Sequence, residues 1–569
     1  MARVGAVERG AGYAERGAAE AEPQAVWRCA LALVTLLLAC SGLVVGAVAE
    51  EPPIDSELED ALSGFEGDDS DAEALSGFGD DDPDADILSG FEDDEEADFA
   101  SGAPVEAERW WDLSGDFVLG ASYNYIPHYS SSGTFYGNLQ KLRTKLALQF
   151  DAELPGDWEL RFAGYGFYDF AYLMHGRENY TEQVLELYEY WGEIQDAYVE
   201  GSVHDQVDLK IGRQVVNFGR SETFRLLDIV NPVDNREPGV VDLEDIRRST
   251  AMLRMGFFHG PWTLTGLVIP ELRFDLLPPF GSDFFPEIPD IASVLTLDDL
   301  CNAPDSPLVP DGADLETVCT VVAPPGDPLR DQTIAELQET YSGSFPDPGD
   351  IQIETMRPAS WDASNIEYAL NLTGIFRGWD ISFQGAYYWD DLAHVDLATG
   401  TLRHARLWMV GTGGNYTWGS WLFKLEAAYV DGLRFMFADG KKSRFDIMGG
   451  IEYFGFSETS ISFEIVNRHL FDYEDRIGEG FDATRENDVQ LALRITREWL
   501  NARLRTTLLA SSFGLIAQGG SFVRLSAEYE ITDAFKTEGG VVFYQSGDNI
   551  FFRNIEDNDR LFLNFKYSF

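Results

Sequence analysis

The chain ends in Leu561-Phe-Leu-Asn-Phe-Lys-Tyr-Ser-Phe569. Apolar side chains occupy every second position from Leu561 to Phe569, and Asn564, Lys566 and Ser568 stand between them. Successive side chains of a strand point to opposite faces, so this alternation predicts a strand with one apolar and one polar face. Such a strand requires an apolar environment on one side and water on the other.

The same two-residue alternation recurs along most of the chain. Clear examples are residues 142–154, 379–389, 421–429 and 489–495. A Lys or Arg on a lipid-facing strand position at the middle of a bilayer costs about 2–4 kcal/mol, so the charged positions are expected to face inward. The pattern therefore predicts strands with apolar outer faces around a polar, hydrated interior.

Short and long connections alternate between these strands. The short ones are residues 155–157, 203–206, 259–261, 377–378, 418–420, 456–458, 501–502 and 532–535. The longer ones are residues 127–138, 175–190, 221–249, 271–363, 390–403, 431–441, 469–487, 513–520 and 546–559. Short periplasmic turns and long external loops are typical of bacterial outer-membrane barrels. We predict an all-β fold, a transmembrane antiparallel β-barrel of about 18 strands, or 16 to 20 if one hairpin is misread.

The last strand resembles the closing strand and assembly signal of Gram-negative outer-membrane barrels, with Phe565, Tyr567 and Phe569 on its apolar face. The resemblance implies that the chain contacts outer-membrane lipid and lipopolysaccharide and is inserted by the barrel assembly machinery. Composition agrees: 13% of residues are aromatic and the mean hydropathy is −0.18. A barrel with a hydrated lumen is expected to be slightly polar overall.

The longest apolar run, Cys29 to Ala49, follows Arg28 and ends in Ala47-Val48-Ala49. A positive flank, an apolar core and small residues at the end indicate a secretory signal, so we expect cleavage near Ala49. Two alternatives concern its boundaries: translation could start at Val26, and residues 37–40 could form a lipoprotein cleavage box. We predict a signal peptide at 1–49, an acidic arm at 50–108 and a barrel at 109–569.

Residues 50–108 contain 24 acidic residues and no Lys or Arg. Such a segment cannot bury enough apolar surface to fold, so we predict a disordered periplasmic arm. The sequence Leu-Ser-Gly-Phe recurs every 13 residues, and repeated apolar motifs on one tether suit multivalent docking to a periplasmic partner. The candidate docking residues are Leu62, Phe65, Leu75, Phe78, Leu88 and Phe91. A solvated spacer is the alternative.

The mature chain keeps two cysteines, Cys301 and Cys319, both in the longest loop. In an oxidising compartment we expect them to form a disulfide that contributes roughly 3 kcal/mol by closing a loop of about 17 residues. No His lies near them, so a metal site is not expected.

The net charge of the chain is −57, of which the acidic arm contributes −24, and this negative charge makes nucleic acid a poor partner.

One basic and aromatic segment, residues 209–250, stands out from this acidic background. From residue 221 onward it is the third long connection, and an inward-folded loop at this position would narrow a channel, with its charges setting selectivity. The alternative is an ion-pair network that braces the wall through Arg213, Arg220 and Arg236 to inward carboxylates such as Asp208. The candidate pore-lining residues are Lys210, Arg213, Gln214, Asn217, Arg220, Arg225 and Arg236.

Within this segment, Gly-Arg-Gln-Val-Val-Asn-Phe-Gly (212–219) and Ile-Val-Asn-Pro-Val-Asp (229–234) resemble the hallmark of a family of proteobacterial outer-membrane proteins filed under a domain of unknown function. Phe218 and Arg220 stand where the family pattern has Trp and Glu. Genes of this family often neighbour resistance-nodulation-division exporters. The resemblance therefore implies a porin-like barrel that passes apolar or amphipathic compounds and is coupled to a periplasmic or inner-membrane exporter.

Two other function classes are weighed against a channel. A surface receptor or adhesin would use the long loop 271–363 to bind a partner. An outer-membrane hydrolase would need a nucleophile beside a histidine, but the seven histidines are scattered, and no GxSxG, HExxH, phosphate-binding or CxxC motif occurs. We therefore predict a non-enzymatic outer-membrane channel without catalytic residues, metal or cofactor.

Overall fold

The computed structural model describes residues 109–241, 243–286, 294–303, 317–334, 336–337, 354–480 and 482–569. The predicted signal peptide, the whole acidic arm and all six docking candidates lie outside these residues. The docking candidates are Leu62, Phe65, Leu75, Phe78, Leu88 and Phe91.

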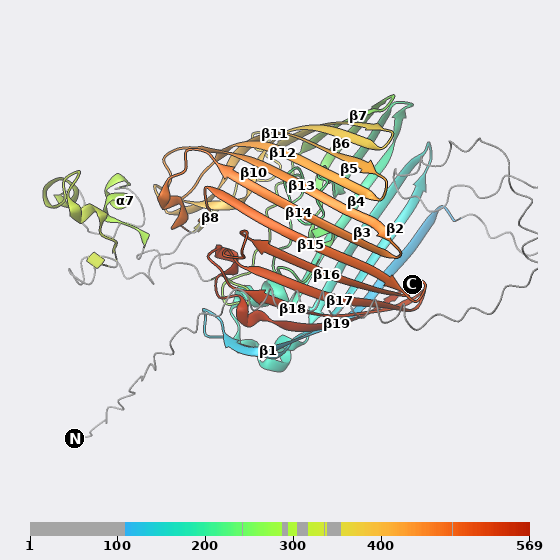
Figure 1. Cartoon of the computed structure of the whole chain (residues 1–569), viewed down its shortest axis with the longest axis horizontal. Helices are drawn as coiled ribbons and strands as arrows, with labels where there is room; N and C mark the ends of the chain where they lie inside the picture. The colour runs from blue at the N-terminus through green and yellow to red at the C-terminus, as the bar shows by residue number, and fades with distance from the viewer. Residues whose placement is uncertain are drawn as a thin grey trace, which may run out of the picture. The chain divides into compact units, whose positions relative to one another are not determined.

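Eighteen antiparallel strands form a closed barrel, as the sequence predicted (Figure 1). Each strand pairs with its sequence neighbour, and β1 closes the ring against β19 in a register that runs from Asp116↔Ser568 to Asn124↔Arg560. A short nineteenth strand, β8 (Glu354–Met356), pairs in parallel with β11. The barrel strands are β1 Trp111–Tyr129, β2 Phe135–Leu154, β3 Trp158–Asp169, β4 Tyr190–His204, β5 Val207–Gln214, β6 Thr250–His259, β7 Trp262–Ile269, β9 Glu367–Phe376, β10 Trp379–Asp396, β11 Thr401–Trp418, β12 Trp421–Leu433, β13 Lys442–Phe456, β14 Thr459–Leu470, β15 Asn487–Trp499, β16 Leu504–Phe513, β17 Ser521–Thr532, β18 Phe535–Gln545 and β19 Arg560–Ser568.

The outer surface of the barrel is apolar because the outward positions of the alternating strands are apolar. On β19, Phe565 is 48% exposed, whereas Arg560 on the inner face is 4% exposed. Equivalent outward positions on other strands carry Phe383, Leu425 and Phe463. A closed sheet leaves no unpaired edge, so an apolar outside of this kind fits a transmembrane barrel.

All eight short turns lie where the sequence places them, and the last strand ends on this turn side of the barrel, beside the start of β1. The long connections lie on the opposite, loop side. Two of them are much shorter than expected: residues 397–400 instead of 390–403, and residues 130–134 instead of 127–138. The strands on either side continue beyond the predicted boundaries, because paired residues such as Val395↔Leu402 extend the ladders.

Short helices occur within the longer loops. They are α3 Ala171–His175, η1 Arg177–Asn179, α4 Glu182–Val184, η2 Leu185–Glu189, α5 Leu243–Ile246, α7 Leu297–Asn302, η3 Val318–Val322, η4 Pro328–Asp331, η6 Asp475–Gly478, η7 Ile550–Phe552 and η8 Glu556–Asn558. In the part of the chain that the structure describes, no helix is long and apolar enough to cross a membrane.

The interior is less polar than the alternation predicted. Residues 215–249, here called the lumen loop, pack apolar side chains against the inner wall: Leu227 contacts Leu407 and Met409, and Phe224 packs with Met448 and Val466. A third group joins Val216, Phe218 and Val230 of the loop to Met252, Leu267, Ile269 and Ala369 of β6, β7 and β9. Much of the wall from β6 to β15 is therefore covered by protein and not by water.

Candidate functional site

The lumen loop is held inside the barrel by two buried carboxylates of the opposite wall. Glu426 on β12 is 0% exposed and accepts hydrogen bonds from the backbone amides of Ser221 (3.1 Å) and Leu227 (3.3 Å), and from that of Arg220. Glu464 on β14 accepts from the Ser221 hydroxyl at 2.6 Å. Hydrogen bonds to a charged acceptor are about twice as strong as neutral ones, so these contacts fix the path of the loop.

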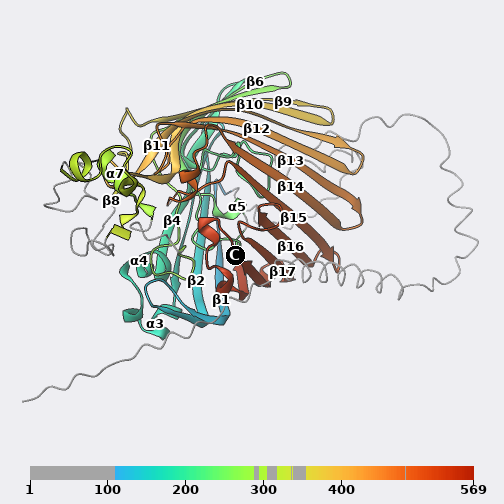
Figure 2. The ribbon, with the colours of Figure 1, turned by 60° about the vertical axis from the view of Figure 1, so that its left-hand side comes forward.

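The far part of the loop is held by two other strands. Tyr544 on β18 donates to the carbonyl of Pro238 at 2.7 Å, and Arg524 on β17 donates to that of Val240 at 2.8 Å. Between these contacts and the Glu426 anchor the loop spans the lumen, and Figure 2 shows α5 inside the ring of strands. The loop therefore divides the interior.

The family-like motif forms the root of this loop. Asn231 is fully buried, accepts a hydrogen bond from the Val216 amide at 2.7 Å and donates to the carbonyls of Gln214 (3.2 Å) and Arg248 (2.9 Å). Its side chain thus ties together both ends of the loop. Gly212 has φ +131°, and a Cβ there would collide with the carbonyl oxygen of Ala197, so this position requires glycine.

Four of the seven predicted pore-lining residues hold the wall or the loop root. Arg213 pairs with Glu271, and Arg220 pairs with Asp380 at 2.8 Å. Asp208, the partner suggested from sequence, instead accepts from the Ser202 hydroxyl at 2.6 Å. The buried Gln214 amide donates to main-chain carbonyls of β5 and β6, and Asn217 accepts from the Gly219 amide at 2.7 Å.

The other three candidates lie apart from one another. Lys210 pairs with Glu200 at 2.9 Å and lies 3.6 Å from the centre of the Tyr198 ring. Arg225 lies among Asp228, Asp275 and Asp391, at 3.7 to 3.8 Å. Arg236 forms a two-point ion pair with Asp234, at 2.8 and 2.5 Å, and faces the larger cavity of the lumen.

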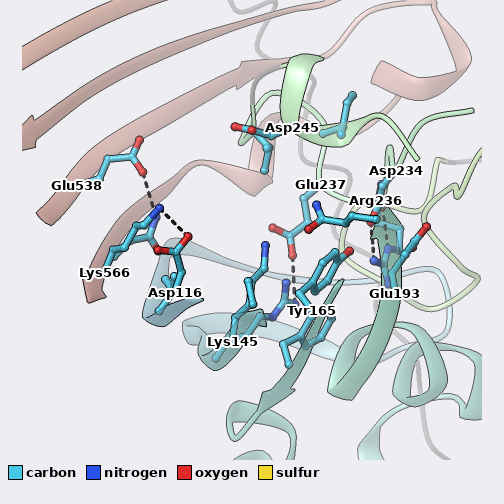
Figure 3. A pocket seen from close by; sticks show the side chains of 18 of the residues that line it. Asp116, Lys145, Tyr165, Glu193, Asp234, Arg236, Glu237, Asp245, Glu538 and Lys566 are labelled. Atoms are coloured by element: carbon cyan, nitrogen blue, oxygen red, sulfur yellow. Dashed lines mark hydrogen bonds and ion pairs between the residues drawn. The ribbon is translucent and has the colours of Figure 1, made fainter. Parts of the chain in front are cut away.

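This larger cavity, here called the wall cavity, has a volume of about 530 Å³ and lies between the lumen loop and the strands β1–β4 and β17–β19. Figure 3 shows its charged side chains reaching in from both sides. Its acidic lining residues are Asp116, Glu193, Asp234, Glu237, Asp245, Glu528 and Glu538, and its basic ones are Arg143, Lys145, Arg236, Arg247, Arg248, Lys536 and Lys566. The two signs balance, in contrast to the strongly acidic chain as a whole.

Glu237 of the lumen loop meets the wall at this cavity. Burial would raise the pKa of its carboxyl, but ion pairs with Lys141 and with Arg143 (3.3 Å) outweigh burial and hold the pKa well below its usual value. Glu237 is therefore charged at neutral pH, and removing either cation would leave a buried carboxylate undercompensated.

A second cavity of about 300 Å³ continues the wall cavity, and Lys145, Glu237 and Asp245 line both. Lys566 lines the wall cavity and Arg560 lines the second, and both belong to β19. Six residues of a strand span about 20 Å, so the two cavities follow the wall across much of the membrane-spanning sheet.

Several residues of this site were not identified from sequence, among them Lys145, Asp116 and the loop anchors Glu426 and Glu464. The alternation of apolar and polar residues placed Lys145 and Glu426 on inward faces, and this is the sequence signal that could have identified them. Which inward charges meet a loop and which meet water depends on the path of the loop.

On the loop side, residues 294–303, 317–334 and 336–337, here called the rim segment, form a small folded unit. Cys301 and Cys319 form a disulfide with Cα atoms 5.7 Å apart. Leu295, Leu300 and Ile334 pack in an apolar cluster with Val395 of β10 and with the neighbouring loop. An ion pair between Asp299 and Arg476 (2.7 Å) adds a second attachment to the barrel rim.

Residues 128–569 match the family described as Protein of unknown function (DUF1302). A search of curated proteins finds no match. Similar solved structures include OccAB2 of Acinetobacter baumannii, with 10% identity over 81% of this chain and 98% of that chain and a TM-score of 0.43. Another is the outer membrane protein OpdK from Pseudomonas aeruginosa, with 9% identity over 80% of this chain and 99% of that chain and a TM-score of 0.40. The family match extends from the end of β1 to the last residue.

Proposed function

Because the chain belongs to the DUF1302 family, whose description assigns no activity, we propose a function from the geometry: an outer-membrane channel that passes small amphipathic solutes. The short turns then face the periplasm and the long loops face outward. The observation that carries the proposal is the lumen loop, which crosses the barrel yet leaves the charged wall cavity open beside it.

The chemistry of the lumen supports solutes with both polar and apolar parts. Fourteen charged side chains line the wall cavity, so a purely apolar molecule would have to displace their hydration without replacing it. On the other side of the loop, the lining of a cavity of about 300 Å³ against β14–β17, here called the loop-side cavity, includes six phenylalanines. Both surfaces suit a molecule that carries a charged or polar group on an apolar body.

A cysteine placed in the wall cavity tests the proposal. Asp245 lies on α5 and lines the cavity, and the two described cysteines are joined in a disulfide. We expect the purified Asp245→Cys protein to conduct in planar bilayers and to lose most of its conductance when a bulky thiol reagent is added. The matched control is Ala398→Cys, at an exposed loop position. A wild-type protein that does not conduct ions, or equal block of both variants by the thiol reagent, would contradict the channel function.

A receptor function is the second candidate, and the rim segment favours it. Val321 and Val322 of η3 are 73% and 55% exposed, on a unit that the disulfide and the Arg476 ion pair hold in place. A protein that conducts no ions but binds cells or matrix through this segment would support the receptor.

We further propose that the acidic arm docks a periplasmic partner, such as an exporter subunit. Its three equally spaced motifs support multivalent binding. The test is deletion of residues 50–100: unchanged transport together with unchanged partner recovery would remove the docking role while leaving the channel intact.

A further inference from the structure

The loop-side cavity combines an aromatic wall with guanidinium groups. It lies between the lumen loop, the inner faces of β14–β17 and the loops 270–366 and 546–559. Its aromatic lining consists of Phe224, Phe284, Phe513, Phe522, Phe551 and Phe552. A volume of about 300 Å³ is at the lower end of the range of small-molecule sites.

The charges that line this cavity are mainly positive. Arg225, Arg468 and Arg494 contribute guanidinium groups, and Glu222 contributes the single carboxylate of the lining. The carboxylate of Glu222 is already engaged by Lys424 at 3.2 Å. The cavity lining thus carries three guanidinium groups and one carboxylate, although Asp228, Asp275 and Asp391 lie behind Arg225 at 3.7 to 3.8 Å.

Arg468 has hydrogen-bonding capacity that its protein partners do not use. Its contacts to Asp446 and Asp488 measure 3.9 and 3.8 Å, which is longer than a hydrogen bond. Among the described residues it donates one hydrogen bond, to the carbonyl of Arg225 at 3.1 Å. A guanidinium has five N–H donors, so several remain for the two oxygens of a carboxylate.

We propose that the loop-side cavity binds small amphipathic anions, with the carboxylate at Arg468 and the apolar or aromatic body against the phenylalanines. This assignment rests on the proposed channel function and names its substrate class. A cation would face three guanidinium groups, and a sugar would leave the phenyl wall without apolar contact. An aromatic or medium-chain carboxylate satisfies both surfaces.

Calorimetric titration of the purified full-length protein with 3-phenylpropionate, against its neutral analogue 3-phenylpropan-1-ol, tests the proposal. We expect the wild type to bind the acid more tightly than the alcohol. Arg468→Gln should weaken acid binding by about tenfold or more and leave alcohol binding unchanged, because a hydrogen bond to a charged group is lost. Phe551→Ala should weaken both ligands. Arg553→Gln is the matched control, since it removes the same charge outside the cavity lining.

Folding of each variant is checked by heat-modifiable mobility, and Arg468→Lys provides a second variant that keeps the charge and should retain the preference for the acid. Equal affinity of the wild type for acid and alcohol would overturn the proposal. So would an Arg468→Gln protein that folds and binds the acid normally. Bilayer conductance without ligand separates the two claims: acid binding by a non-conducting protein would refute the channel and leave the site.

Discussion

Lys145 on β2 should set part of the ion preference of the channel. Its ammonium lies 4.2 Å from the centre of the Tyr165 ring and lines both connected cavities. Figure 3 shows it directed toward the part of the lumen loop that carries Glu237 and Asp245. An ion that follows the wall must pass this charge.

The size of the effect follows from the cavity volume. A sphere of about 530 Å³ has a radius of about 5 Å, and adding about 3 Å for the contact between the cavity edge and the amine places an ion at the centre about 8 Å from the amine. In water a unit charge at about 8 Å contributes about 0.5 kcal/mol. Replacing Lys145 by Gln should thus lower the barrier for a cation and raise that for an anion by about this amount, a fivefold change in the unscreened permeability ratio.

Salt reduces this effect in a calculable way. The Debye length is about 30 Å at 0.01 M and about 3 Å at 1 M, so the ratio should shift about fourfold toward cations at 0.01 M and hardly at all at 1 M. Lys145→Glu should produce about twice the change in free energy, because the charge changes by two units.

The assay is the reversal potential of the reconstituted protein under a salt gradient. The matched control is Lys441→Gln, which removes the same charge from an exposed loop position outside both cavities. Unchanged reversal potential in folded Lys145→Gln at 0.01 M would show that ions do not pass along the wall cavity. An equal shift in the control would attribute the effect to overall charge.

Three further predictions concern stability and assembly. Replacing Cys301 and Cys319 by Ser should destabilise the rim segment by roughly 3 kcal/mol and speed its proteolysis, with no change in the heat-modifiable band of the barrel. Phe569→Ala should lower the yield of assembled protein, measured as the folded fraction in membranes, because the Phe569 ring packs over Gly115 of β1 and 6.0 Å from the Tyr567 ring at the β1–β19 closure; a normal yield would exclude this role. Burial raises the pKa of Asp482 to about 6 despite a hydrogen bond from the Met436 amide (2.8 Å). A carboxyl whose pKa is higher in the folded than in the unfolded protein stabilises the folded loop at pH values below its unfolded pKa, and this stabilisation is lost as the pH rises through about 6. Protection of the Met436 amide from hydrogen exchange, corrected for the intrinsic exchange rate, should therefore be greater at about pH 4 than at about pH 7.5. In Asp482→Asn the protection should not depend on pH.

The strand count and all eight short turns could be predicted because a lipid-facing surface imposes a strict rule. A charge at the middle of the outer face costs several kcal/mol, so positions such as Phe383 and Phe565 must be apolar at every second residue. Residues such as Gly156, Gly378 and Gly419, with positive φ, mark the turns directly. Both signals are local in sequence.

The partners of the candidate arginines could not be predicted, because they are distant in sequence. Arg220 pairs with Asp380, 160 residues away, and Arg213 pairs with Glu271, 58 residues away. The sequence offered a choice between pore lining and wall bracing for the whole group. The structure divides the group instead: Arg213 and Arg220 hold the wall, whereas Arg236 faces the wall cavity.

Side-chain polarity is less constrained on the inner face of the barrel than on the outer face, and this explains why part of the inner wall is apolar. An inward side chain can face water or a packed loop, and either environment is stable. Met409 is 1% exposed although it points inward, because it lies in an apolar cluster with Leu227 of the lumen loop, while its neighbours Trp408 and Val410 point outward to lipid. The run from Leu407 to Val410 is therefore continuously apolar, as expected for a strand covered on both faces. Interruptions of the alternation such as this one thus indicate where the loop packs, whereas kept alternation does not distinguish loop from water: Glu426 on β12 binds the loop, and Lys145 on β2 lines the wall cavity.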